Sequence, residues 1–528
     1  MHSECYPISV LPRLNRLFLD YAASHEPLTP FFFASPYSQE WMHRPSALDT
    51  PARNRLADLL EEQNRAFGAG AATFANIEKL LGGSSAVVTG QQVTLFGGSL
   101  FTLLKAATAI RKAKDAGAVP IFWLASEDHD VAEADHISLP SRHEMHTLRV
   151  THDPADAGKP VGSVKLGAGI TAVIEQAAEL LGPSPVLDAI QAAYTPDATF
   201  AEAFGKLMAA IFADQGLILI DAADRHFHAA GAPVLRHAIE HAAEFEAALL
   251  ERSKLLESRG YESQVLVAPS SSLLFLLDED GVRLSLKRRE NGWTAGKKSY
   301  STEELLAILE ATPERLSPNA LLRPVFQDFI LPTAAYIGGP AEIAYFAQSQ
   351  VLYDAILGRT TAVLPRLSAT LVEPAVATVM AQHELSLDDI LHTRPDELAQ
   401  RLGARSIPIE GKQKLAAAGN ALDAELQDVT QWMTALDAGL GRSAEVAASK
   451  MRYQMNRLRR LAANYQLQVE GSLRRHVDAL YLALFPDQHP QERIVGAAAF
   501  LARYGDGLIP LLVEHAAQEC PGHRAIYL

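Results

Sequence analysis

Short apolar runs recur along this chain, and each leads into a segment with a helical pattern. Most of them end in glycine or acidic residues, and their continuous apolar character is typical of strands buried on both faces. Strands that alternate with helices predict an α/β fold, with a mostly parallel sheet covered by helices on both sides. The runs occupy residues 85–89, 119–125, 216–221, 331–337 and 361–371.

Two segments differ from this alternation. Residues 149–215 are rich in alanine and helical in pattern, with proline and glycine breaks, so we predict a helical insertion. Residues 263–298 contain short β runs, and the Asp-Gly and Asn-Gly pairs at 280–281 and 291–292 are typical of hairpin turns. We therefore predict a β-hairpin region there, within a core that extends over residues 1–383.

Residues 384–490 have the pattern of a long helical hairpin. Apolar residues recur in a first stretch at seven-residue intervals, and in a second at three- and four-residue spacings, with Gly439 and Gly441 between the two stretches. The pattern predicts an antiparallel coiled-coil arm, and the alternative is an ordinary helical pair packed on the core. We expect residues 491–528 to return to the core. The seven-residue repeat consists of Leu415, Leu422, Val429 and Leu436.

Composition limits the classes of function. The chain has 528 residues and a formal net charge of −15, so it has no general attraction for nucleic-acid phosphates. Its two cysteines, Cys5 and Cys520, form no CxxC pair, which argues against a thiolate zinc site or a disulfide-stapled secreted domain. No signal peptide or membrane-spanning run is present in the sequence. We expect a cytoplasmic protein without nucleic-acid or membrane partners.

The first candidate site lies at residues 89–105, where a strand runs through a glycine turn into a helix. Free N–H groups at the start of that helix, beside Gly98, can bind an anion. Lys105 adds a positive charge, and the amides of Gln91 and Gln92 can donate and accept hydrogen bonds at the strand end. No Walker A or GxGxxG motif is present, so the alternative is a tight turn without a ligand.

The second candidate site follows the apolar strand that contains Trp123, a candidate binding residue. An imidazole among carboxylates can accept a proton from an amine and orient a cationic substrate. If the backbone stays extended, Glu127 and His129 face one way and the two aspartates face the other. The alternatives are an acidic turn that caps the next helix, or a metal site, although no established metal-binding spacing is present. The four candidate catalytic residues are Glu127, Asp128, His129 and Asp130.

The third candidate site is a strand-to-helix turn that contains Gly339. Pro340 suits the first position of a helix, and Glu342 falls in the first turn, near the positive end of the helix dipole. Tyr345, three residues later, lies on the same side of the helix. The alternative for Glu342 is a helix cap.

Two arginines near strand ends, Arg323 and Arg366, complete the candidate binding residues. Each is either a ligand for a carboxylate or phosphate, or the partner in a structural ion pair. Ligands of open parallel sheets bind outside the carboxyl ends of the strands, which is where these motifs are expected to lie.

These motifs, taken in order, resemble those of the bacillithiol-biosynthesis cysteine-adding enzymes, and the match runs over almost the whole chain. The chain departs from the usual family pattern at Thr94 and Ser99, where glycine and proline are more common. The matching motifs are GQQ followed by Gly98 and Lys105, then FWLASEDHD, IGGPAEIAYF, PRLSATLVE and QERIVGAAAFLARYG.

The resemblance implies a Rossmann-like core with connecting insertions and an antiparallel coiled-coil arm that serves in homodimerisation. It also implies a ligase reaction, the addition of cysteine to glucosaminyl-malate in the last step of bacillithiol biosynthesis. Formation of that amide requires an activated cysteine carboxylate. ATP is the natural activator and is therefore the expected cofactor, although no standard ATP motif is present.

Two other classes of function remain open. A metal-dependent hydrolase would use Asp128, His129 and Asp130 on a divalent ion to activate water. A non-catalytic coiled-coil scaffold would not need glutamine, histidine and acidic residues at strand ends, so alanine substitutions there would have no effect.

Overall fold

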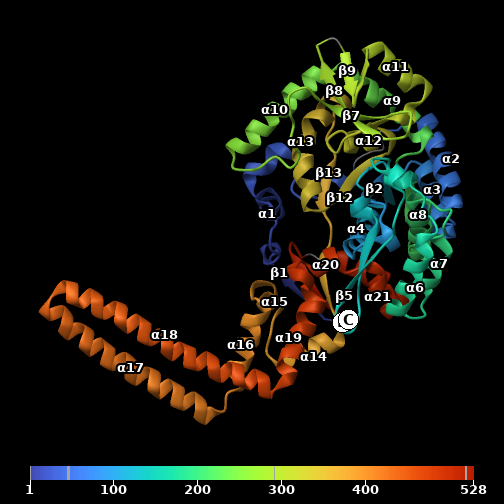
Figure 1. Ribbon diagram of the computed structural model, residues 1–528. Coiled ribbons are helices and arrows are strands. Elements are labelled where there is room, and N and C mark those ends of the chain that lie inside the picture. Colours follow the sequence, from blue (N-terminus) through green and yellow to red (C-terminus); the bar gives the residue numbers. More distant parts are fainter. Residues whose placement is uncertain (1, 44–47, 291, 518–519) are drawn as a thin grey trace. The chain divides into compact units, whose positions relative to one another are not determined.

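The computed structural model describes residues 2–43, 48–290, 292–517 and 520–528. The chain forms two compact units (Figure 1), a larger one of Ser3–Thr370 and Pro490–Ala525, and a smaller one that is mainly Leu371–His489. The larger unit contains the sheets and the candidate site residues, and the smaller unit is helical.

A five-stranded sheet forms the centre of the larger unit, in the order β13-β12-β2-β3-β6. Every pair of neighbouring strands is parallel, so the predicted parallel α/β core is confirmed. The strands are β2 (Ala86–Gln92), β3 (Val119–Ala125), β6 (Ile218–Asp221), β12 (Thr333–Gly338) and β13 (Ala362–Pro365).

Both faces of this sheet are buried, which explains why its strands are continuous apolar runs. On one face, Val87 and Ile337 pack with Ala109 of helix α4. On the other face, Val88 and Ile121 belong to a large core shared with α2, α3, α9, α12 and α13. The helices named here are α2 (Thr50–Ala66), α3 (Ala71–Leu81), α4 (Phe101–Ala116), α9 (Arg225–Glu240), α12 (Arg323–Ile330) and α13 (Pro340–Leu357).

The connection from β3 to β6 carries the predicted helical insertion. It begins with the short helix α5, forms the two-stranded sheet of β4 and β5, and continues through three longer helices. Its elements are α5 (Val131–Ala134), β4 (His136–Pro140), β5 (Met145–Arg149), α6 (Gly169–Leu181), α7 (Pro185–Ala193) and α8 (Phe200–Ile211). The other helices of the larger unit are α1 (Arg16–Ala22), α10 (Ala242–Ser258), α11 (Thr302–Ala311), α20 (Gln491–Ile494), α21 (Ala497–Tyr504) and α22 (Leu508–Ala517).

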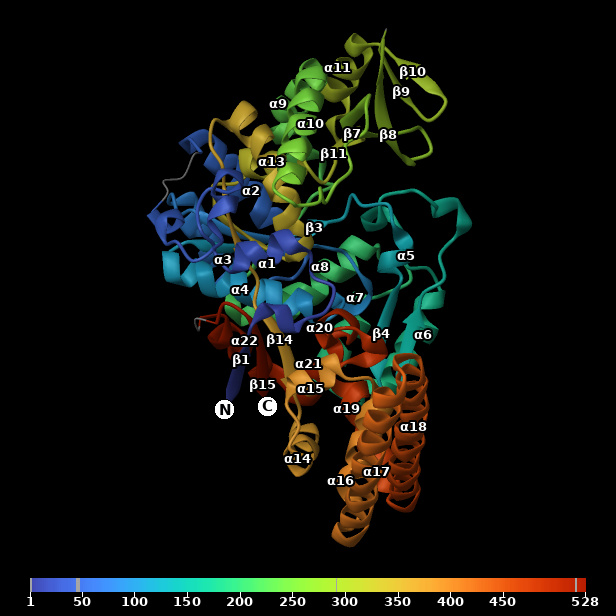
Figure 2. The same cartoon turned by 90° about the vertical axis from the view of Figure 1, so that its left-hand side faces the viewer.

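A second five-stranded sheet, antiparallel throughout, contains the predicted hairpin region (Figure 2). Gly281 takes a left-handed conformation, with φ of 79°, in the turn between β7 and β8, which confirms the first predicted hairpin turn. The second predicted turn includes Asn291, which lies outside the described residues. The strands are β7 (Ser271–Leu277), β8 (Arg283–Arg289), β9 (Gly292–Ala295), β10 (Lys298–Tyr300) and β11 (Leu316–Pro318).

The prediction of one strand over residues 361–371 is wrong, because the chain forms two strands there. β13 ends in the parallel sheet at Pro365, and β14 (Ser368–Val372) belongs to a three-stranded sheet in the order β1-β15-β14. Between them, the side chain of Arg366 turns to a buried carboxylate, and this turn separates the two strands. The other two strands are β1 (Ser3–Tyr6) and β15 (His523–Tyr527).

The smaller unit contains the predicted hairpin of long helices, α17 (Ile409–Leu436) and α18 (Ala438–Val469), which lie side by side in both views. The turn falls at Asp437, and Gly439 and Gly441 lie just after it, in the first turn of α18. The Asp437 carboxylate accepts hydrogen bonds from two N–H groups of the first turn of α18 and so caps that helix. The other helices of this unit are α14 (Pro374–Gln382), α15 (Leu387–His392), α16 (Pro395–Ser406) and α19 (Gly471–Leu484).

Large apolar side chains are exposed along both long helices. Trp432 is 61% exposed and Leu458 is 54% exposed, although side chains of this kind are normally buried. We expect this apolar surface to pair with a second copy of the chain. Replacing Val429 and Trp432 with lysine should then reduce the mass in solution, measured by light scattering, from twice 57.2 kDa to 57.2 kDa.

The matched control for this dimer prediction replaces Gln427 with lysine, because that side chain is also exposed on α17 but is polar. This variant should keep the mass of the unmodified protein. An unmodified protein of 57.2 kDa in solution would contradict the expected dimer.

Candidate active site

Ionisable and amide side chains gather at the carboxyl ends of the parallel strands. Gln91 and Gln92 end β2, Glu127 follows β3 by two residues, and Asp221 ends β6. Glu342 lies in the first turn of α13, directly after β12. Because β2 pairs in parallel with both β12 and β3, these groups lie along one edge of the sheet. This edge is where ligands bind in sheets of this class.

A buried ion pair between Lys105 and Glu342 lies at the ends of β2 and β12. Lys105 Nζ is 2.5 Å from Glu342 Oε2, and it also donates to the carbonyl of Gly90 at 2.7 Å and to Gln91 Oε1 at 3.0 Å. The Tyr336 hydroxyl donates to Glu342 Oε1 at 2.6 Å. Burial alone would raise the pKa of Glu342, but Lys105 and these hydrogen bonds lower it, so the carboxylate stays ionised.

Glu342 is both a helix cap and a member of this charged cluster. The N–H of Gly339 donates to Glu342 Oε2 at 2.7 Å, so Glu342 caps the start of α13, which was the alternative considered for it. Arg323 donates to the hydroxyl of Tyr345 at 2.7 Å, so that tyrosine faces the same cluster. Burial raises the pKa of Tyr345 to about 12, so it remains a neutral hydroxyl at physiological pH.

A second buried ion pair, Glu127 with His228, lies at the end of β3. His228 is fully buried in α9, its Nε2 is 2.7 Å from Glu127 Oε1, and its Nδ1 is 2.9 Å from the carbonyl oxygen of Leu316. Burial opposes protonation of His228, but the Glu127 carboxylate outweighs it and raises the pKa of the imidazole. Beside this pair, the hydroxyl of Ser126 donates to Asp221, and burial raises the pKa of that carboxyl group.

The extended backbone considered for residues 127–130 is not observed. β3 ends at Ala125, and the carbonyls of Ser126 and Asp128 accept hydrogen bonds from Gly162 and Val161. These bonds turn the chain, so Glu127 points into the interior while His129 lies nearer the surface.

The other members of the acidic run have different partners. Asp128 accepts from the N–H groups that follow it, and Asp130 caps α5 by accepting from the N–H of Glu133. His129 Nδ1 lies 3.4 Å from a guanidinium nitrogen of Arg283. Among the described residues, no three His, Cys, Asp or Glu side chains form a group that could hold a metal ion.

The glycine turn after β2 brings two threonine hydroxyls close to Gly98. A Cβ on Gly98 would lie 2.4 Å from Thr94 Oγ1 and 3.2 Å from Thr102 Oγ1, so a larger residue would collide with these side chains. Neither hydroxyl has a hydrogen-bond partner within the described part of the chain, and Thr102 is fully buried. Lys105, which was expected to contribute to the same site, instead directs its ammonium group to Glu342.

Arg366 and Trp123 are both buried in the fold. Arg366 forms a two-pronged ion pair with Glu492 at 2.9 and 2.6 Å, which is the structural alternative considered for this residue. Burial alone would raise the pKa of Glu492, and Arg366 lowers it to about 2. Trp123 is fully buried in β3, with its ring edge-on to Phe326.

Four residues of this edge were missed by the sequence motifs. Asp221 could have been found, because it ends an apolar strand in the same way as Glu127. His228 and Arg283 gave no signal, because one lies inside a helix and the other comes from the second sheet. Tyr336 was indistinguishable from a core aromatic residue.

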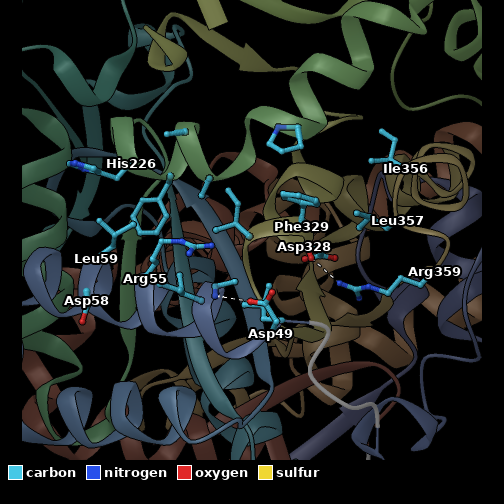
Figure 3. Close-up of a pocket in the computed structure, with 18 residues that line it drawn as sticks. Asp49, Arg55, Asp58, Leu59, His226, Asp328, Phe329, Ile356, Leu357 and Arg359 are labelled. Carbon is cyan, nitrogen blue, oxygen red and sulfur yellow. Dashed lines mark hydrogen bonds between the residues drawn. The ribbon is translucent and has the colours of Figure 1, made fainter. Parts of the chain in front are cut away.

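A separate cavity of about 980 Å³ opens between α2, α9, α12 and α13 (Figure 3). Its walls are mainly apolar, with Leu59, Phe329 and Leu357 among them, and Arg55 and Arg359 lie at its sides. The described residues that line it include none of the candidate site residues discussed above. Within the described residues, no helix is long and apolar enough to cross a membrane.

Comparisons with known proteins agree with the fold. The N-terminal Rossmann-like domain of bacillithiol biosynthesis BshC matches residues 1–367, and the C-terminal coiled-coil domain of the same family matches residues 369–528. The molecule is thus a Rossmann-like α/β protein with a coiled-coil arm. The chain belongs to the bacillithiol biosynthesis BshC family.

Similar proteins align with the full length of the chain. A protein of Koribacter versatilis is 43% identical over 100% of both chains, and one of Solibacter usitatus is 35% identical over 100% of both. A protein of Salinibacter ruber is 30% identical over 98% of this chain and 97% of its own. All three bear the name "Putative cysteine ligase BshC".

We expect Glu492→Gln to lower the free energy of unfolding by about 3–5 kcal/mol at pH 7, because it leaves the buried Arg366 guanidinium without its charged partner. The folded-state pKa of Glu492 is below its ordinary value of 4.5, so the ion pair contributes fully above that value. The contribution is lost as the pH falls toward about 2. Urea denaturation at several pH values should therefore show the two proteins converging in acid.

The matched control is Glu514→Gln in α22, because that side chain is exposed. It should leave the urea midpoint nearly unchanged at every pH. A constant difference between Glu492→Gln and the unmodified protein from pH 7 to pH 3 would contradict this account of the ion pair.

Proposed function

We propose that this protein is a cysteine ligase that joins the carboxylate of cysteine to the amine of glucosaminyl-malate in bacillithiol biosynthesis. Its relatives bear the name of cysteine ligases. The observation that carries the proposal is the buried Glu127–His228 ion pair, 2.7 Å apart, at the carboxyl end of β3. An amide-forming reaction needs a group of this kind, because the attacking amine must first lose a proton.

Glu127 is the proposed base. The amine of a sugar is an ammonium ion at neutral pH, and a carboxylate beside it both attracts the cation and accepts its proton. The Glu127 carboxylate raises the pKa of His228, and the imidazole is proposed to orient that carboxylate. Asp128 and His129, nearer the surface, are proposed to attract the ammonium group, whereas Asp130 serves as the cap of α5.

The Lys105–Glu342 ion pair is proposed to position the other half of the site. Lys105 fixes the carbonyl of Gly90 and the amide of Gln91 at the end of β2. On the other side, Arg323 donates to the hydroxyls of Tyr345 and Tyr336, and the hydroxyl of Tyr336 donates to Glu342. The amide of Gln91 is then presented to the substrates in one orientation, which lowers the entropy cost of bringing them together.

ATP is the proposed activator of the cysteine carboxylate, because it supplies the group that turns a carboxylate oxygen into a leaving group. The phosphate is proposed to bind near Gly98, because the hydroxyls of Thr94 and Thr102 have no partner among the described residues there, close to the N-terminus of α4. Thr102 Oγ1 would donate a hydrogen bond to a phosphate oxygen there.

Incubation of the protein with glucosaminyl-malate, cysteine and ATP, followed by mass spectrometry, tests the reaction directly. We expect Glu127→Gln to lower turnover by about 10²–10⁴-fold, the usual contribution of a general base. Near-normal turnover by this variant would contradict the assignment of the base, and failure of the unmodified protein to form the amide would contradict the reaction.

The matched control for the base is Glu133→Gln. Glu133 lies in α5, six residues further along, and its side chain is exposed. It should turn over nearly as fast as the unmodified protein. Circular dichroism of both variants distinguishes loss of chemistry from loss of the fold.

We expect Thr102→Val to raise the KM for ATP roughly 10–100-fold, the cost of one hydrogen bond to a charged group. Valine has nearly the shape of threonine, and the Thr102 hydroxyl has no partner among the described residues, so the melting temperature should change little. The measurement is initial rate against ATP concentration.

The control for the ATP prediction is Thr108→Val in the same helix. Thr108 donates to the carbonyl of Leu104 and accepts from the N–H of Leu367, so its loss should lower stability without changing the KM for ATP. An unchanged KM in Thr102→Val would place the nucleotide elsewhere.

A further inference from the structure

A second, smaller cavity of about 370 Å³ lies in the larger unit, on the side of α4 near its last turns. Residues from distant parts of the sequence meet there. Among its lining residues are Trp41, Lys112, Arg366, His515, Cys520 and Arg524. It contains none of the proposed base or amide groups, and the proposed ligase reaction makes no use of it.

The cavity is basic in a chain of formal net charge −15. Lys112, Arg366 and Arg524 line it, and no described lining residue is an aspartate or glutamate. Arg366 is neutralised by Glu492, whereas Lys112 has no hydrogen bond or ion pair within the described residues. A small molecule with carboxylate groups would therefore gain electrostatic attraction on entering this cavity.

A disulfide joins Cys520, in the wall of this cavity, to Cys5 in β1. The two Cα atoms are 6.0 Å apart, within the ordinary range for a disulfide. Cys5 is exposed, and Cys520 is partly exposed. Exposed disulfides exchange with thiols more readily than buried ones, because the attacking thiolate must reach a sulfur along the S–S axis.

We propose that this cavity binds small thiols that carry carboxylates, and that the bound thiol exchanges with the Cys5–Cys520 disulfide. The thiolate of the ligand attacks Cys520 Sγ, the S–S bond breaks, and Cys5 leaves as a thiolate that takes a proton from water. A second molecule of thiol then attacks the ligand sulfur of the mixed disulfide. That step releases an oxidised dimer of the ligand and leaves both cysteines reduced.

Cysteine, the proposed substrate, is one thiol of this class, but the inference goes beyond the ligase reaction and does not depend on it. The disulfide links β1 to the residues just before β15. These two strands belong to one sheet, so a thiol that opens the disulfide removes a covalent link within that sheet. His523 of β15 bonds to Ser368 and Thr370 of β14. Exchange at Cys520 therefore breaks the covalent link between β1 and the segment that leads into β15, the strand whose His523 bonds to β14.

The test measures how fast different thiols reduce the oxidised full-length protein. Mercaptosuccinate, cysteine, 2-mercaptoethanol and cysteamine are compared at equal thiolate concentration, and free cysteines are alkylated and counted by intact mass. Each rate is divided by the rate of the same thiol with 2-hydroxyethyl disulfide, which removes differences in nucleophilicity. We expect mercaptosuccinate to exceed cysteamine by about tenfold at low salt, and the ratio to fall as salt rises.

Lys112→Gln should remove most of the advantage of mercaptosuccinate, whereas Lys114→Gln, an exposed residue of the same helix outside the cavity, should not. Peptide mapping after brief exposure should find the mixed disulfide on Cys520. Equal normalised rates for all four thiols, an adduct on Cys5, or two free thiols in protein purified without reductant would each overturn the proposal.

Discussion

The buried ion pair of Arg366 and Glu492 is the interaction on which much of the larger unit depends. It lies where the chain leaves the parallel sheet, and the Glu492 carboxylate also accepts from the hydroxyl of Ser368 and the N–H of Ala369. Four hydrogen-bond donors on one carboxylate offset the cost of burying its charge. The ion pair thereby holds the start of β14 against α20, a helix in the C-terminal part of the chain.

The candidate site follows the same physical rule, since its charges are buried in pairs that satisfy one another. Lys105 with Glu342 and Glu127 with His228 each join residues from separate strands or helices at one edge of the sheet. A buried charge whose partner is removed costs several kcal/mol, so these pairs hold the strand ends in a single arrangement. The ion pairs thus limit the orientations of the charged groups at this edge of the sheet.

The sequence was sufficient to predict the elements whose signals are local. Apolar runs predicted the parallel strands, and the turn before Glu342 was recognised from its glycines and proline. The break at Arg366 was missed although Pro365 and Arg366 interrupt the apolar residues there, because the sequence does not show that β14 pairs in a different sheet. His228 and Arg283 were missed because their roles depend on tertiary contacts. Gly439 and Gly441 lie inside α18, because Asp437 caps that helix ahead of them.

The ion pair between Arg366 and Glu492 also has a consequence for how the chain is made. Its partners are 126 residues apart, and the smaller unit lies between them in sequence. At a synthesis rate of roughly 5–20 residues per second, the ribosome delivers the glutamate about 6–25 seconds after the arginine. During that interval the Arg366 side chain stays hydrated, and β14 lacks its hydrogen bonds to Glu492. The larger unit therefore completes its folding only after the arm has been synthesised.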